Sequence, residues 1–413
     1  VEVPIAIYLG YLIYKKGANI MTWSIFAVVA MYVCVFLGPY LPFKMPAIAG
    51  IPPTGVWTII LLTYAFIASI LPVTTLLQPR DFINSHQLVI AMALLMLGVL
   101  VASFGGNLSI VAPAVQTTPA EAPPMWPFLF ITIACGAISG FHSLVSSGTS
   151  AKQVRNENDA LFVGYGSMLM EGALATLVII AVAAGIGMGY TTKAGETLTG
   201  VAAWSTHYAS WAAAAGLGSK IAAFVDGSAN MIMTLGISKQ FTLAIMAVFV
   251  ASFAGTTLDT ATRIQRYVIG ELGQSLKLNF LSDRYVATAV AIGSALILAF
   301  ATGASGNGAL KLWPLFGAVN QTLAALALII ITLYLKSKDG MKWLVAGVPA
   351  VFMSFMTIWA LIMNQFKFGT AHNGLLQTVN LIILVIAVWI AIEGLIKFFS
   401  PTHIAEDPAP VTT

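Results

Sequence analysis

The sequence has few charged residues and almost no cysteine. Only 8% of its 413 residues are Asp, Glu, Lys or Arg, and 59% are hydrophobic, whereas an ordinary soluble domain carries roughly 25% charged residues. This deficit excludes a soluble enzyme and indicates a polytopic membrane protein. The net charge of +4 is too small for a nucleic-acid-binding surface. Cys34 and Cys135 both lie in apolar stretches, so neither a disulfide framework nor a thiolate metal site is expected.

Long apolar runs predict the membrane crossings. A helix needs about 20 apolar residues to cross a bilayer, within a range of about 17–25. Runs of this kind predict an all-α protein of about eleven transmembrane helices, the first of them short. The moderately apolar stretch 201–238 is interrupted at Gly216, Gly218, Asp226 and Gly227 and predicts two short helices lying against the membrane protein. The predicted spans are 3–14, 21–39, 55–78, 86–104, 126–147, 160–188, 241–262, 285–301, 312–335, 343–363 and 375–398.

The basic residues predict the orientation of these spans, because cytoplasmic loops hold the excess of Lys and Arg. If the 15–20 loop is inside and the sides alternate, thirteen basic residues fall on the inner side and six on the outer side. Arg80 counts among the thirteen in the loop after span 55–78, and Arg263 and Arg266 count as residues of the inner interface. The long 105–125 loop has no basic residue and is predicted to be external.

The predicted spans divide the chain into four segments. Residues 1–188 carry transmembrane helices of the core, 189–240 form an external loop with short or re-entrant helices, and 241–399 carry the C-terminal transmembrane helices. The polar residues 400–413 predict a short cytoplasmic tail. The chain begins with Val1 inside an apolar run, so we expect residues upstream to be missing.

Interrupted helices point to functional sites, because irregular backbone in a membrane is tolerated only against protein or a water-filled cavity. The first interruption is expected in 69–80. Pro72 removes one backbone hydrogen bond, and Ser69, Thr74 and Thr75 supply hydroxyls for the freed groups or for a substrate. A simple proline kink explains this segment equally well.

The second interruption is expected in 134–154, where three glycines allow close helix approach or an unwound turn. His142 lies among several hydroxyl side chains of this segment. A lone histidine is usually a packing residue, but one in a hydroxyl-rich, glycine-interrupted membrane segment is a better site candidate because it titrates near neutral pH. The candidate substrate ligands here are Gly140, His142, Ser143, Ser146 and Ser147.

Polar residues within two later spans are further candidates. An acid at membrane depth costs roughly 2.5–3.5 kcal/mol on insertion scales, so Glu171 is expected to have a partner or a function. It is a candidate for proton coupling, and the alternative is a protonated carboxyl hydrogen-bonded between helices. Asn320 and Gln321 are expected to join helices rather than to bind substrate.

The last polar segment is 252–272. Gly255 is followed by two threonines and is predicted to end one helical piece and start the next. Asp259 and Arg263 are four residues apart, so a helical ion pair is available. Asp259 is equally a candidate ion or proton site.

Five stretches together resemble the carbon starvation protein A family of bacterial inner-membrane transporters. The resemblance extends over essentially the whole chain. It implies uptake of peptides or pyruvate when carbon runs short, and a fold similar to the amino acid–polyamine–organocation superfamily with its five-plus-five inverted repeat. The stretches are LPVTTLLQPRDF (71–82), FLFITIACGAISGFHSLVSSGTSAKQV (128–154), FVGYGSMLMEGALA (162–175), TTLDTATRIQRYVIGELG (256–273) and LWPLFGAVNQTLAALAL (312–328).

The resemblance also implies that the first helices of the family are absent from this sequence. Segments 3–14 and 21–39 would be the last two helices of the first repeat. Span 55–78 would open the second repeat, and span 126–147 would be the eighth core helix.

These observations predict a secondary active transporter for a small carboxylate-bearing substrate, driven by protons or sodium across the lipid bilayer. The sequence has no P-loop that would couple ATP, and its five histidines are too scattered for a metal site, so we expect no enzyme, metal or cofactor. A channel or a membrane nutrient sensor without coupling is the alternative. We expect the substrate site between the Pro72 interruption and the Gly140–Gly148 segment, with His142 or Glu171 exchanging the proton.

Overall fold

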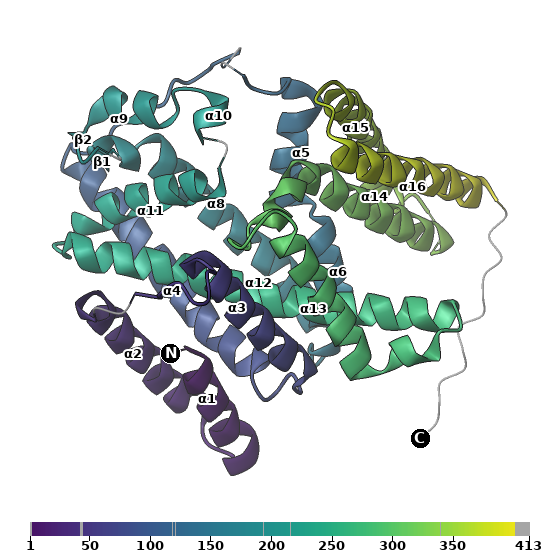
Figure 1. The fold of residues 1–413 in the computed structure, drawn as a ribbon, viewed down its shortest axis with the longest axis horizontal. Coiled ribbons are helices and arrows are strands. Elements are labelled where there is room, and N and C mark those ends of the chain that lie inside the picture. Colours follow the sequence, from purple (N-terminus) through teal and green to yellow (C-terminus); the bar gives the residue numbers. More distant parts are fainter. Residues whose placement is uncertain are drawn as a thin grey trace. The chain divides into compact units, whose positions relative to one another are not determined.

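The computed structural model describes residues 2–41, 44–117, 119, 121–192, 194–214, 216–338 and 340–400, and nearly all of them lie in or between helices (Figure 1). Val1 and almost all of the predicted tail lie outside these ranges. In the described ranges, nine helices are long and apolar enough to cross a membrane. Two of the eleven predicted spans are shorter than the 18 residues taken as the minimum for a crossing: α1 (Glu2–Lys16) has 15 residues and α13 (Arg284–Phe300) has 17. The chain is thus a multi-pass helical membrane protein, and the count of eleven stays a prediction.

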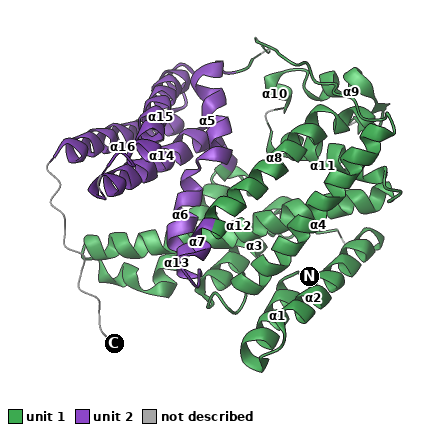
Figure 2. Ribbon diagram, turned by 180° about the vertical axis from the view of Figure 1, so that it is seen from behind, with its two compact units in different colours: residues 1–122, 162–309 green, residues 123–161, 310–413 purple. Residues whose placement is uncertain are grey.

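The chain forms two compact units, each made of two separate stretches (Figure 2). Unit 1 comprises residues 1–122 and 162–309, and unit 2 comprises 123–161 and 310–413. Short 3₁₀ helices occur at Gly38–Tyr40, Ser150–Lys152, Gly185–Met188, Asn279–Ser282 and Gly308–Leu312.

Unit 1 is built around the long helices α4 and α12. Its largest buried apolar cluster contains Leu95 of α4, Met231 of α11 and Met246 of α12. A two-stranded antiparallel hairpin pairs β1 (Tyr190–Thr191) with β2 (Thr197–Leu198). The helices are α1, α2 (Ile20–Leu37), α3 (Pro53–Ile70), α4 (Leu77–Phe104), α8 (Ser167–Ala183), α9 (Gly200–His207), α10 (Trp211–Ala214), α11 (Leu217–Met233), α12 (Lys239–Ser275) and α13, with a π-helical turn at Phe162–Gly166 before α8.

The interruption predicted at Pro72 is confirmed. Helix α3 ends at Ile70 and α4 begins at Leu77, so the connection between them is not helical. Helix α4 starts nine residues before the predicted span 86–104. Pro79 is compatible with this start, because the first turn of a helix has backbone N–H groups without intrahelical partners.

Two predicted interruptions in unit 1 are wrong. Helix α12 runs through Gly255 without a break, and the Thr257 hydroxyl donates to the Phe253 carbonyl at 3.0 Å, within the same helix, instead of capping a new one. Helix α11 likewise continues through Asp226 and Gly227. Gly227 serves close packing: an added Cβ would lie 2.1 Å from the Ala181 carbonyl oxygen. The 201–238 stretch therefore forms three helices, α9 to α11, rather than two.

Unit 2 combines three long helices with a broken one. Helices α14, α15 and α16 pack on one another, while α5 contacts α14 and α15, and α6 contacts α14. Its helices are α5 (Met125–Ala137), α6 (Gly140–Gly148), α7 (Asp159–Leu161), α14 (Trp313–Ser337), α15 (Leu344–Thr370) and α16 (Gly374–Phe399).

Candidate functional site

The connection between α3 and α4 places the four predicted residues in different surroundings. Ser69 is fully buried, and its hydroxyl has no hydrogen-bond partner in the part of the chain that the structure describes. Pro72 and Thr74 are exposed, and Thr75 is half-buried. The Thr75 N–H donates to the Pro72 carbonyl at 3.0 Å and closes a turn. The connection thus offers one buried hydroxyl and two more accessible ones.

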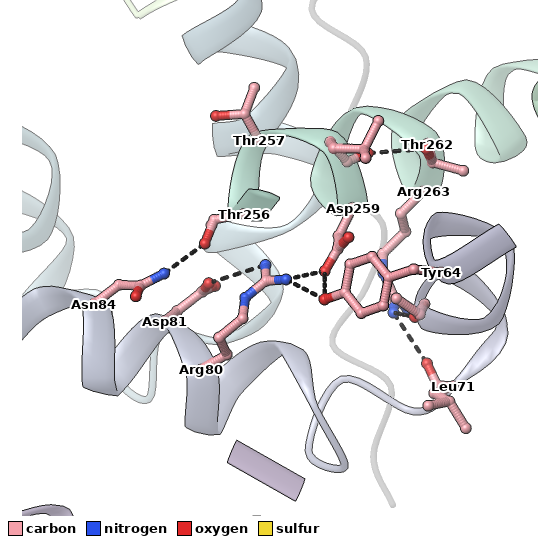
Figure 3. A network of polar contacts seen from close by, with 12 residues as sticks. Tyr64, Leu71, Arg80, Asp81, Asn84, Thr256, Thr257, Asp259, Thr262 and Arg263 are labelled. Carbon is pink, nitrogen blue, oxygen red and sulfur yellow. Dashed lines mark hydrogen bonds and ion pairs between the residues drawn. The ribbon is translucent and has the colours of Figure 1, made fainter. Parts of the chain in front are cut away.

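A buried ion pair lies beside this connection (Figure 3). The Arg80 guanidinium on α4 donates through Nη1 to the Asp259 carboxylate on α12 and contacts the Tyr64 hydroxyl on α3. Tyr64 in turn donates to Asp259 Oδ2 at 2.7 Å. Arg80 and Asp259 are each only 2% exposed. The consecutive helices α3 and α4 therefore meet the distant helix α12 at one fully desolvated charge pair.

Arg263 stabilises the broken end of α3. Its Nη2 donates to the carbonyls of Ala68 and Leu71, at 3.0 Å each. The last four carbonyls of a helix lack intrahelical partners, and a cationic side chain there satisfies them and complements the helix dipole. The predicted helical pair between Asp259 and Arg263 is therefore wrong: Asp259 pairs with Arg80, and Arg263 binds backbone.

Three arginines that were counted on the inner side of the membrane lie inside the protein, and their side of the membrane stays a prediction. Arg80, Arg263 and Arg266 are buried, with exposed fractions of 2%, 5% and 7%. They lie within α4 and α12 rather than in a loop. Arg80 was assigned to a loop because α4 was predicted to start later than it does. Its position in the first turn turns the side chain toward α12.

The network has more buried positive than negative charge. Among the described residues, the fully buried ionisable groups near the connection are three arginines and one aspartate. Asp81 and Glu2, which are half-buried, supply negative charge at the edge, and Asp81 Oδ1 lies 3.8 Å from Arg80 Nη2. The Nε and Nη2 atoms of Arg80 are buried and have no hydrogen-bond partner among the described residues. Guanidinium donors in this state favour a carboxylate ligand, because an Arg–carboxylate pair is commonly bidentate.

A cavity of about 310 Å³ adjoins the network. Its polar wall is formed by Tyr14 of α1 and by Gln78, Asp81 and Ser85 of α4. The Tyr14 hydroxyl donates to Gln78 Oε1 at 2.8 Å. The volume is at the lower end of the range of small-molecule sites, about 300–1,000 Å³. Asp81 is shared by the cavity and the ion-pair network, so it connects the two.

In unit 2, two amides of α14 satisfy the break between α5 and α6. Asn320 Oδ1 accepts from the Phe141 N–H at 2.7 Å, and its Nδ2 donates to Ser139 Oγ at 3.1 Å. The Gln321 amide is oriented so that both its nitrogen and its oxygen form hydrogen bonds. In this orientation its nitrogen donates to the Ile138 carbonyl at 2.7 Å. The prediction that Asn320 and Gln321 join helices is confirmed.

The candidate residues of α6 are arranged around this break. Gly140 is buried against α14, where an added Cβ would lie 2.0 Å from the Asn320 carbonyl oxygen. The hydroxyls of Ser143 and Ser147 donate to carbonyls of their own helix, at 2.6 and 3.0 Å. Each oxygen keeps its acceptor capacity for another group. The side chains of His142 and Ser146 are exposed in the described structure.

Glu171 lies in the second turn of α8 and is half-buried. The π-helical turn at Phe162–Gly166 precedes this helix, and such turns are frequent at functional sites. No part of the sequence pattern indicated the π turn. In the described ranges, no three His, Cys, Asp or Glu side chains gather closely enough to hold a metal ion.

A further buried histidine lies outside the candidate spans, on α9. The His207 ring is 6% exposed and packs edge-on against Tyr190 and Tyr208. Burial lowers the pKa of His207, while the nearby Asp226 carboxylate opposes this shift. Burial therefore favours the neutral form of the ring, and His207 is explained as a packing residue of the hairpin segment.

Two members of the network, Arg80 and Tyr64, were missed in the sequence. Arg80 could have been recognised, because a charged residue eight positions after Pro72 lies close enough to the interruption to turn into the protein. No feature of the sequence indicated Tyr64, since a tyrosine in an apolar span is equally typical of a membrane interface.

The fold and the site define a multi-pass helical membrane protein with a desolvated charge network at an interrupted helix. The chain belongs to the carbon starvation family: the family model described as "Carbon starvation protein CstA" matches residues 1–360. No solved structure matches the chain, and the inverted-repeat fold remains a prediction.

Curated relatives of the chain are named as transporters. The pyruvate/proton symporter BtsT of Escherichia coli is 32% identical, over 90% of this chain and 60% of its own length. The peptide transporters CstA of Helicobacter pylori and Mycobacterium tuberculosis are 30% and 32% identical, over 88% and 87% of this chain. The chain spans 58% and 53% of their lengths, so it corresponds to somewhat more than half of each relative.

Proposed function

We propose that the chain belongs to a secondary active transporter of the bacterial inner membrane that takes up peptides or pyruvate during carbon starvation, coupled to protons. The names of the relatives support this proposal, and one of them is a proton symporter. The observation that carries it in the structure is the buried Arg80–Tyr64–Asp259 network beside the α3–α4 interruption. Peptides and pyruvate share a carboxylate, which is the group that a buried arginine recognises.

The network couples substrate to proton through a simple exchange of counter-charge. In the structure, the Asp259 carboxylate neutralises Arg80. A substrate carboxylate that accepts hydrogen bonds from Nε and Nη2 would replace Asp259 as the counter-charge. Asp259 would then be a buried carboxylate without its cation, and such a group favours protonation. Substrate binding and protonation of Asp259 therefore reinforce each other.

The same argument explains why neither event occurs alone. Protonating Asp259 without substrate leaves Arg80 as an uncompensated buried charge, and breaking one partner of a buried pair costs about 3–5 kcal/mol. Binding substrate without the proton places two carboxylates around one guanidinium. By thermodynamic linkage, the proton must raise substrate affinity by the same factor as the substrate raises proton affinity.

The remaining candidates keep proposed roles in substrate binding. In unit 1, the buried Ser69 hydroxyl and the accessible Thr74 and Thr75 hydroxyls are proposed to bind substrate near the Pro72 turn. In unit 2, Gly140, His142, Ser143, Ser146 and Ser147 on α6 are proposed as substrate ligands. His142 and Glu171 are second candidates for proton exchange.

Transport by the protein reconstituted in proteoliposomes tests the proposal. Labelled pyruvate and labelled dipeptides are supplied with and without an inward pH gradient, and the matched variants are Asp259→Asn and Glu393→Gln. Glu393 is an exposed acid of α16 whose surface pair with Lys397, at 3.9 Å, contributes little. The expected result is accumulation that depends on the gradient in wild type and in Glu393→Gln, and that is lost in Asp259→Asn. Flux that only equilibrates substrate would indicate a channel, and no flux with retained binding would indicate a sensor.

A further inference from the structure

Unit 2 contains an apolar groove of about 310 Å³ between α14, α15 and α16. Its floor consists of small residues on α15 and α16, at positions three apart that share one face of each helix. Its rim consists of large apolar side chains: Val351, Leu395 and Phe399 are 68%, 55% and 79% exposed. The small floor residues are Gly347, Ala350, Ala391 and Gly394.

The groove has the dimensions of a lipid chain rather than of a compact solute. Along α15 it extends from Trp343 to Ser354, and at 1.5 Å per residue this is about 16 Å. Its lining is almost entirely carbon, with Thr332 and Ser354 as the hydroxyl-bearing residues. A peptide or a carboxylate would find no charged partner in this lining.

One end of the groove is strongly basic. Lys336 donates through Nζ to the carbonyl of Phe398, a groove residue, and its Nζ lies 4.3 Å from the Phe398 ring centroid. Lys338 and Lys342 follow on the α14–α15 connection, directly before Trp343, and Lys397 lies beside Phe398 on α16 with an exposed side chain. Within the sequence from Lys336 to Lys342 and the last turns of α16, the acidic residues are Asp339 and Glu393.

The rest of the same three helices is much less basic. Their two other lysines, Lys311 and Lys367, lie at the start of α14 and near the end of α15, which are the opposite helix ends. By the excess of basic residues, the lysine-rich end is predicted to face the cytoplasm. Trp343 at this end is typical of the membrane interface.

We propose that this groove is a binding site for one acyl chain of an anionic phospholipid, whose headgroup lies among Lys336, Lys338, Lys342 and Lys397. Basic pockets between transmembrane helices on the cytoplasmic side bind anionic headgroups, and the apolar groove of about 310 Å³ provides the space for the chain. The site is independent of the proposed transport site, since it uses none of the residues of the Arg80 network.

Native mass spectrometry of the full chain, delipidated in detergent and titrated with dioleoyl phosphatidylglycerol or dioleoyl phosphatidylcholine, tests this site. Ala391→Phe fills the groove, and its control is Ile392→Phe at a neighbouring position that is 52% exposed. Ser354→Leu is a second filling variant. Lys342→Gln with Lys397→Gln removes headgroup charge, and Lys367→Gln is its control at the other end of α15.

The wild-type chain is expected to bind one phosphatidylglycerol about tenfold more tightly than phosphatidylcholine. The filling variants should lose both lipids, the double lysine variant should lose only the preference for phosphatidylglycerol, and both controls should behave as wild type. Equal binding of the two lipids, or binding that is unchanged in both filling variants, would overturn the proposal. A dimer that Ala391→Phe dissociates, with no bound lipid, would show instead that a second copy occupies the groove.

Discussion

Replacing Arg80 by Met should strongly destabilise the protein. The change removes the guanidinium from an Asp259 carboxylate that is 2% exposed and leaves it with the Tyr64 hydroxyl at 2.7 Å as its remaining donor. Each lost hydrogen bond to a charged group costs about 1.5–3 kcal/mol. Stranding one charge of a buried pair costs about 3–5 kcal/mol in total, which is the expected loss in free energy of unfolding.

A double-mutant cycle separates this effect from a general loss of packing. Asp259→Asn in the Arg80→Met background removes the stranded charge, so the double variant should be more stable than the sum of the two single changes by about 1–3 kcal/mol. Unfolding in bicelles, measured by steric trapping, gives the free energies. The control is Lys397→Met, which breaks an exposed pair and should cost no more than about 1 kcal/mol. A loss below that value in Arg80→Met, or additive effects in the cycle, would refute the buried pair.

Three further predictions concern the α5–α6 break and the topology. Gly140→Ala should destabilise unit 2 by about 1–3 kcal/mol, because its Cβ would overlap the α14 backbone. Thermal unfolding checks this against Gly136→Ala, whose added Cβ would meet no described atom outside its own helix backbone within 4 Å, so little change is expected. Asn320→Leu should cost about 1–3 kcal/mol by leaving an α6 backbone N–H unpaired, and unchanged unfolding would contradict this capping role. In a cysteine-free background, cysteines introduced at 118, which lies outside the described residues, and at 153 should label from opposite sides of the membrane; labelling from one side would contradict the predicted orientation.

Local chemistry made part of this architecture predictable. Pro72 lacks a backbone N–H, so a disturbance of the helix within residues 69–80 could be predicted from the sequence, although the span was drawn to residue 78 and a simple kink was equally possible. The polar amide of Asn320 in an apolar span predicted a contact between helices, and the structure has that contact with α6. These features depend on residues whose effect is confined to their own turn or to one neighbouring helix.

Long-range packing accounts for what the sequence did not predict. Arg80 and Asp259 are 179 residues apart, and a single sequence gives no means of pairing them. The only ion-pair partner that the sequence analysis considered for Asp259 was therefore its local neighbour Arg263. The local signal of Gly255 for a helix end was overridden by packing of α12 against α3, α4 and α13. Tertiary contacts routinely override such propensities.

Proton movement during substrate uptake tests the central claim most directly. Proteoliposomes that contain a pH-sensitive dye are given an inward gradient of pyruvate or dipeptide at equal internal and external pH. Wild-type protein should acidify the lumen as substrate enters, because the substrate carboxylate on Arg80 promotes protonation of Asp259. Asp259→Asn should exchange labelled for unlabelled substrate without acidification. Acidification that persists in Asp259→Asn would contradict the account and assign the coupling proton to another group.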